Sequence, residues 1–117
     1  MPADRVATAF EAIDEVGRPS SLRRVTGSIR IELTGRKPER WLIEIDRGNI
    51  SVSRRNRKAD CVARCSREQF ERLLDRRDNV MAAVLRGAVE IEGDAGLLMP
   101  LRKLLVATPS AEGEGAA

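Results

Sequence analysis

Three consecutive segments in which apolar and polar residues alternate constrain the fold of this chain most. In GSIRIELT, residues 27–34, aliphatic side chains alternate with arginine, glutamate and threonine, and residues 40–46 and 50–53 repeat the pattern. Alternation with a period of two predicts β-strands that bury one face. The short sequences GRKP and DRGN separate the segments, and such turns join antiparallel neighbours. The three segments therefore predict an antiparallel meander with one apolar face.

Two further strands and four helices complete the predicted order. Residues 59–65 and 88–92 have the pattern of strands, and apolar residues at helical spacing fill most of the remaining chain. The helices are expected over 4–16 and after the capping residues Ser66, Asn79 and Asp94. The order is then helix, four strands, two helices, strand and helix. It predicts an α+β fold, a five-stranded and mostly antiparallel sheet with helices covering one face.

The last predicted helix carries a continuous apolar stripe. Its members are Leu97, Leu98, Leu101, Leu104 and Leu105. A soluble chain buries such a stripe in its own core, offers it to a partner, or closes it over an apolar ligand, and the sequence leaves all three open. Pro100 follows the Asp94 cap by six positions, where its ring removes a helical hydrogen bond. We therefore expect a kink or a frayed first turn here.

The length of 117 residues suits one domain, which we expect over 1–106. Residues 107–117 lack periodicity and are predicted to be a disordered tail. No apolar run approaches the ~18 residues that a membrane-spanning helix needs. The N-terminal segment carries acidic residues where a signal peptide has an apolar core. These features favour a cytoplasmic location.

The sequence lacks the residues that most catalytic and metal sites need. It has no histidine, which excludes Ser-His and Cys-His nucleophile pairs and the usual metal centres. Cys61 and Cys65 lie four residues apart on a predicted strand, roughly 13 Å, too far for a disulfide. Glycine-rich phosphate loops are absent as well. The sequence therefore predicts no catalysis, no cofactor and no metal.

The charge pattern argues against a nucleic-acid partner. The net charge is only +3, and aromatic residues make up 3% of the chain. Proteins bind single-stranded nucleic acid by stacking bases on aromatic rings within a strongly basic groove. This chain has few aromatic rings and only a small positive net charge. We expect no nucleic-acid binding.

Two motifs, in their order and spacing, resemble the sterol carrier protein 2 family. The first is Ala59-Asp60 before a strand that ends at Ser66, followed by a helix containing Phe70. The second is Ala82-Ala83, then Gly87, an alternating strand, Gly93-Asp94 and a leucine-rich helix. The likeness covers residues 27–105, most of the chain. It implies a five-stranded sheet whose inner face and helices enclose an apolar tunnel.

The resemblance implies non-catalytic binding or transfer of a hydrophobic lipid: a sterol, fatty acid, acyl-CoA or phospholipid. The side chains expected to line the tunnel are Trp41, Ile43, Ile50, Val52, Val84, Leu85, Val89, Ile91, Leu97, Leu98 and Leu101. Ordinary core packing explains the same apolar residues equally well, because protein interiors normally fill to high density. In the family, the last helix covers the tunnel mouth.

A basic loop and the leucine stripe suggest further contacts. Arg54, Arg55, Arg57 and Lys58 form the loop, whose cations are candidates for an anionic headgroup or a transient anionic membrane surface. The simpler explanation of these four cations is that they lie on a loop exposed to solvent and bind nothing. The alternative function is a protein–protein interaction module or homodimer that uses the leucine stripe around a filled core.

Overall fold

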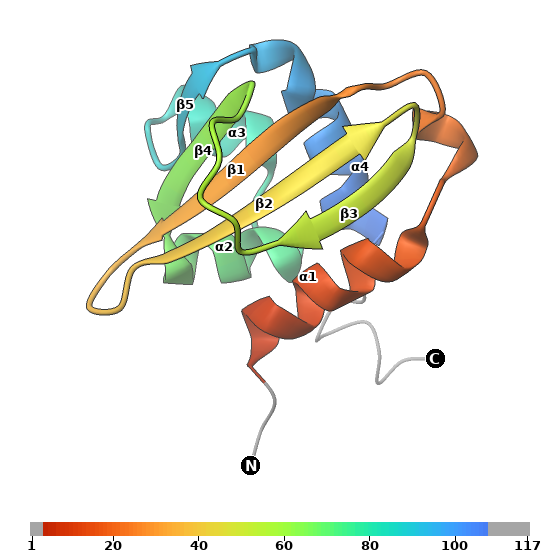
Figure 1. The fold of residues 1–117 in the computed structure, drawn as a ribbon. Helices are drawn as coiled ribbons and strands as arrows, with labels where there is room; N and C mark the ends of the chain where they lie inside the picture. The colour runs from red at the N-terminus through yellow and green to blue at the C-terminus, as the bar shows by residue number, and fades with distance from the viewer. Residues whose placement is uncertain (1–3, 108–117) are drawn as a thin grey trace, which may run out of the picture.

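The computed structural model describes residues 4–107 of the chain (Figure 1). The helices and strands are α1 (Arg5–Val16), β1 (Gly27–Thr34), β2 (Glu39–Asp46), β3 (Asn49–Ser53), β4 (Cys61–Ser66), α2 (Arg67–Leu74), α3 (Val80–Leu85), β5 (Glu90–Gly93) and α4 (Leu98–Ala107). Two 3₁₀ turns, η1 (Ser20–Leu22) and η2 (Ala95–Leu97), precede β1 and α4. The order of elements agrees with the prediction. None of the helices within 4–107 has the length and apolar character needed to cross a bilayer.

The five strands form one sheet in the order β3-β2-β1-β4-β5. Three neighbouring pairs are antiparallel, and β1 pairs with β4 in parallel. The mostly antiparallel α+β architecture is therefore confirmed. The parallel pair requires a crossover from β3 to β4, and Figure 1 shows this segment, residues 54–60, passing over the sheet face opposite α2 and α4.

The inner face of the sheet and the helices share one hydrophobic core. Its strand members come from the alternating positions, such as Ile29 and Ile31 of β1 and Ile43 of β2. From α1, the buried residues include Phe10 and Ile13, which are fully buried. The helical spacing predicted from the sequence thus turns the apolar face of α1 onto the sheet.

Side-chain caps fix where the helices begin. Ser66 Oγ accepts a hydrogen bond from the Gln69 amide at 3.0 Å, and Asn79 Oδ1 accepts from the Met81 amide at 2.9 Å. Asp94 Oδ1 accepts from the Gly96 amide at 2.9 Å at the start of η2. Each cap satisfies a backbone N–H that has no partner within the first turn. These three predicted caps are confirmed.

Pro100 lies in the first turn of α4, because the chain after Asp94 forms the 3₁₀ turn η2 before the α-helix begins at Leu98. An N–H in the first helical turn has no intrahelical acceptor, so proline removes nothing there. The expected kink or frayed first turn is not seen, because the α-helix begins four residues after the Asp94 cap and Pro100 falls where it fits. The predicted disordered tail, 107–117, lies outside the described residues except for Ala107, which belongs to α4.

The two sequence motifs meet at one corner of the sheet. Asp60 Oδ2 accepts a hydrogen bond from the Ser28 amide at 2.9 Å, and the Asp60 carbonyl accepts from the Asp94 amide at 2.8 Å. Gly93, at φ +88°, lies so close that a Cβ atom would stand 2.2 Å from the Asp60 carbonyl oxygen. Only glycine permits this backbone conformation and approach. The corner joins β1, β4 and β5.

Candidate functional site

A small enclosed cavity of about 10 Å³ lies between the sheet and helices α2 and α4, beside the start of α3. Its lining is entirely apolar and consists of Ile31, Ala63, Cys65, Phe70, Leu73, Val80, Val89, Ile91, Leu101 and Leu105. A buried water needs about 10–15 Å³ together with polar partners, which these side chains do not supply. The interior is therefore dry and nearly closed in this conformation.

The cavity lies where β4, the neighbour of the central strand β1, carries small side chains. Ala63 of β4 pairs with Ile31 on one side and with Ile91 on the other, so the three side chains form one row on the inner face. Cys65 continues the same face of β4 and is buried. Alanine and cysteine leave space that a larger aliphatic residue fills elsewhere on the face. Side-chain size on β4 therefore explains the position of the cavity.

Both cysteines are free and buried, as predicted. Burial raises the pKa of the Cys65 thiol to about 11. Burial also raises the pKa of Cys61, and the nearby carboxylates of Asp94 and Asp60 act in the same direction. The two thiols are neutral at physiological pH, and Cys65 presents an apolar surface to the cavity.

The eleven predicted tunnel residues divide among four places, the last of which is α3 with Val84 and Leu85. Val89, Ile91 and Leu101 line the cavity. On the other half of the sheet, Trp41, Ile43, Ile50 and Val52 belong to or pack against the core, and α1 packs on β3 there. Leu97 and Leu98 are buried where η2 joins α4, and Val84 is half-buried. The structure thus brings only part of the predicted set to one cavity.

Leu85 does not face the interior, so its predicted place in the tunnel wall is wrong. Its side chain is 85% exposed, whereas Val80 and Ala83 are the buried residues of α3. The sequence VMAAVL has apolar residues on several sides, and a six-residue helix offers too few turns for the sequence alone to identify the inner face. Packing against α4 determines it.

Sequence reasoning missed seven of the ten residues that line the cavity. They are Ile31, Ala63, Cys65, Phe70, Leu73, Val80 and Leu105. The alternation of β1 and β4 and the helical spacing of α2 and α4 assign each strand and helix residue to the core. They do not indicate which core residues surround unfilled space, because that depends on the register between distant strands.

A groove of about 420 Å³ lies between the α2–α3 turn and α4. Its lining is Leu73, Arg76, Arg77, Asp78, Asn79, Val80, Arg102 and Leu105. Leu73, Val80 and Leu105 also line the internal cavity. These three apolar side chains therefore form the wall between the groove and the interior.

Asp78 connects α3 to α2 through side-chain hydrogen bonds. Its carboxylate accepts hydrogen bonds from Gln69 Nε2 at 2.6 Å and from the Arg86 guanidinium at 3.1 Å. Hydrogen bonds from Arg86 and from Gln69 hold the pKa of Asp78 well below its usual range. Gln69 belongs to α2, and Arg86 directly follows α3. The two donors therefore hold the short helix over the cavity.

After Arg54, which lies over the Trp41 ring, the basic loop crosses the far side of the sheet from the cavity. The Arg30 guanidinium donates to the Arg57 carbonyl at 3.0 Å, and Arg57 Nη1 lies 3.2 Å from the Glu44 carboxylate. Arg55 and Lys58 are exposed. The loop is the crossover between β3 and β4, and these contacts attach it to the outer face of β1 and β2.

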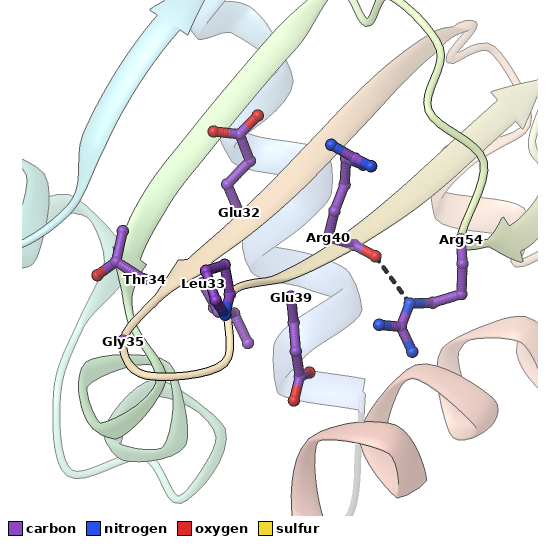
Figure 2. Close-up of a pocket in the computed structure, with 8 residues that line it drawn as sticks. Glu32, Leu33, Thr34, Gly35, Glu39, Arg40 and Arg54 are labelled. Carbon is purple, nitrogen blue, oxygen red and sulfur yellow. Dashed lines mark hydrogen bonds between the residues drawn. The ribbon is translucent and has the colours of Figure 1, made fainter.

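A second surface pocket, about 610 Å³, adjoins the β1–β2 hairpin (Figure 2). Arg54 Nε donates to the Arg40 carbonyl at 2.9 Å, and the Arg54 guanidinium lies 4.3 Å from the centre of the Trp41 ring. Glu32, on the same wall, pairs with Arg30 and Arg64, which hold its pKa below its usual range against the opposing effect of burial. These contacts engage Glu32 and Arg54, two of the four charged residues among the eight that line this open pocket.

The family model described as the SCP-2 sterol transfer family matches residues 7–106. The chain belongs to this family. Its members are commonly lipid- or sterol-binding domains, and they are generally carriers without catalysis.

Similar solved structures share the fold. The crystal structure of sterol carrier protein 2 matches with a TM-score of 0.68 and 18% identity, covering 86% of this chain and 92% of that one. The solution structure of palmitated SCP2L2 from Aedes aegypti matches with a TM-score of 0.66 and 21% identity, covering 86% and 93%. Both values confirm the five-stranded sheet with helices as the family fold.

A curated relative shows the domain inside a larger protein. Hydroxysteroid dehydrogenase-like protein 2 from Xenopus laevis is 24% identical over 105 residues, which is 88% of this chain. This chain spans only 25% of the length of that relative. Members of the family therefore also occur as parts of proteins named as enzymes.

Proposed function

We propose that this chain binds a hydrophobic lipid ligand between its sheet and its helices and transfers it without catalysis. The observation that carries the proposal is the enclosed cavity whose ten lining residues are all apolar, in a domain of the SCP-2 sterol transfer family. An apolar space with no polar group to orient a reaction suits storage of a hydrocarbon. It offers nothing to activate a substrate.

Binding requires the interior to expand. Ligand pockets measure about 300–1,000 Å³, whereas the cavity measures about 10 Å³. Each CH₂ group moved out of water contributes about 0.8 kcal/mol, so ten such groups contribute roughly 8 kcal/mol. This free energy is available to separate packed side chains. The ligand then fills the space that it opens.

The proposed route of expansion is the movement of α3. This helix has six residues and buries only two of them, Val80 and Ala83. Moving it exposes little apolar surface, so the cost is small compared with moving α1 or α4. In the opposite half, the Phe10 ring stacks on Trp41 with a centroid distance of 4.4 Å and occupies the space under α1. The ligand is therefore expected between β4, β5, α3 and α4.

The leucine stripe does not support the alternative of an exposed interaction surface. Leu97, Leu98, Leu101, Leu104 and Leu105 are all at most 6% exposed and pack into this chain's own core. Homodimer formation and contact of the basic loop with an anionic membrane stay predictions.

The test fills the cavity and compares ligand loading. Ala63→Leu adds a bulky side chain to the row between Ile31 and Ile91, so retention of co-purified or added palmitate in native mass spectrometry should fall about tenfold. Ala9→Leu is the matched control, because Ala9 is equally buried but belongs to α1. A wild-type protein that neither co-purifies with lipid nor binds it when titrated contradicts the proposed function.

A further inference from the structure

Exposed apolar side chains concentrate on helices α3 and α4. Among residues 4–107, four large hydrophobic side chains are exposed, and three of them, Met81, Leu85 and Met99, belong to these two helices. Leu85 is 85% exposed, whereas Met81 and Met99 are 41% and 48% exposed. Apolar area in water is unfavourable, so several such residues on one surface indicate a contact site.

The three side chains point away from the core on the helix side of the sheet. Helix α3 buries Val80 and Ala83, while Met81 and Leu85, one turn apart, occupy its other side. The leucines of α4 face the core, and Met99 lies on the solvent side of the same helix. The two helices pack on each other, and Figure 1 shows both behind the sheet. They therefore present these residues on one side of the molecule.

Two cations accompany the apolar residues on α4. Arg102 and Lys103 follow Met99 by three and four positions, so they share its side of the helix, and both are exposed. Neither has a carboxylate partner within the part of the chain that the structure describes. Met81, Leu85 and Met99 together with Arg102 and Lys103 are called the α3–α4 face below. This face combines apolar area with uncompensated positive charge.

The carboxylates close to the two helices in sequence are engaged elsewhere. Asp78, just before α3, pairs with Arg86. The two glutamates of β5 pair with Arg64 at 3.5 and 3.7 Å, on the outer side of the sheet. Asp94 accepts a hydrogen bond from the Gly96 amide as the cap of η2. The cations of the α3–α4 face are therefore available to an anionic partner.

We propose that the α3–α4 face docks on an anionic lipid bilayer, with Leu85 in the boundary between headgroups and acyl chains and Arg102 and Lys103 against the lipid phosphates. Interfacial binding combines buried apolar area with attraction to anionic lipids. A second copy of the chain fits less well, because it brings the same cations face to face. A bilayer also accepts a projecting leucine without a matching pocket. This docking goes beyond the proposed carriage of lipid and does not depend on it.

Vesicle co-sedimentation tests the apolar part of the face. The full chain is mixed with phosphatidylcholine vesicles that either contain or lack phosphatidylserine. Met81→Ser/Leu85→Ser should bind the mixed vesicles about tenfold more weakly than the wild type, because less apolar area enters the bilayer. The control is Val16→Ser, which changes the fourth exposed hydrophobic residue, 36% exposed and located on α1. This control should bind as the wild type does.

A second pair of variants tests the cations. Arg102→Gln/Lys103→Gln should bind vesicles with phosphatidylserine about tenfold more weakly and leave binding to pure phosphatidylcholine unchanged. Arg36→Gln/Lys37→Gln removes the same two charges from exposed positions between β1 and β2 and should have little effect. Added salt should weaken binding of the wild type and reduce the difference between the two variants.

Four results overturn the inference. They are a wild type that binds neither kind of vesicle, equal losses in Val16→Ser and Met81→Ser/Leu85→Ser, equal losses in the two charge variants, and self-association of the wild type that Leu85→Ser abolishes. Circular dichroism of each variant verifies that the fold is intact. Palmitate retention in native mass spectrometry is scored separately. A chain that docks but retains no palmitate contradicts only the proposed function, and one that retains palmitate but does not dock contradicts only this inference.

Discussion

The two halves of the core contrast in how completely they are filled. Under α1, the Phe10 ring stacks between Trp41, at 4.4 Å, and Phe70, at 5.5 Å between ring centroids. Over β4 and β5, Ala63 lies between two isoleucines and leaves a cavity. Apolar side chains make up both halves. Side-chain size, and not hydrophobicity, therefore decides which half of the core keeps unfilled space.

The helices over the two halves, α1 and α3, are also attached by different contacts. The N-terminal end of α1 is attached by the ion pair between Arg5 and Asp75, at 2.7 Å, and by the pairing of Arg67 with Asp4. The Asp14 carboxylate accepts from the Val52 amide at 2.9 Å and attaches the other end of α1 to β3. Helix α3 is held through Asp78, which lies just before the helix and binds Gln69 of α2 and Arg86, the residue directly after α3. The filled half is thus fixed along the whole of its helix.

The largest expected loss of stability comes from removing an aromatic ring in the half of the core under α1. Phe10→Ala leaves a cavity where a fully buried ring was stacked on both faces, and should lower the free energy of unfolding by about 3–5 kcal/mol. Leu101→Ala, beside the existing cavity, should cost less, about 2–3 kcal/mol, because its neighbours already lack some packing partners. Urea denaturation measures both. Equal losses contradict the contrast between the halves.

An intermediate effect is expected when the fastening of α3 is weakened. Asp78→Asn removes the charge that Arg86 and Gln69 bind, so amide exchange in α3 should accelerate roughly tenfold. Exchange in α1 should stay unchanged and serves as the internal control. Hydrogen exchange followed by NMR distinguishes the two helices. Uniform acceleration across the molecule indicates global destabilisation and rejects the idea of a local fastening.

The Asp78 carboxylate also predicts how the free energy of unfolding depends on pH. The pKa of Asp78 is lower in the folded state than the ordinary value of 3.8, so its contribution to stability is complete above that value and is lost as the pH falls below it. The stability difference between the wild type and Asp78→Asn should therefore shrink between pH ~5 and pH ~2. Urea denaturation at several pH values tests the sign. A difference that grows on acidification contradicts the assignment.

The smallest effect is expected on the outside of α3. Leu85→Ser should change the free energy of unfolding by less than about 0.5 kcal/mol, because the side chain is 85% exposed. Thermal unfolding measures it, with Val80→Ser as the buried counterpart on the same helix. A loss of 2 kcal/mol or more, on the scale of a buried leucine, would mean that Leu85 packs inside after all.

Much of the fold could be predicted because its signals are local. Alternation located the strands, and the side chains of Ser66, Asn79 and Asp94 cap the turns that they were expected to cap. A cap and an alternating face involve residues only two or three positions apart, so the sequence contains all the partners. The candidate site was predicted less well. Only Val89, Ile91 and Leu101 of the expected tunnel residues line the cavity.

By itself the sequence determined the type and order of the elements and the apolar face of each strand, together with the absence of histidine chemistry. Only the tertiary structure decided that β1 pairs in parallel with β4, that Leu85 faces solvent, and that the unfilled space lies over Ala63. The physical reason is the range of the interactions. Hydrogen bonds within a turn depend on adjacent residues, whereas strand neighbours, helix rotation and cavities depend on how volumes from distant segments fit together.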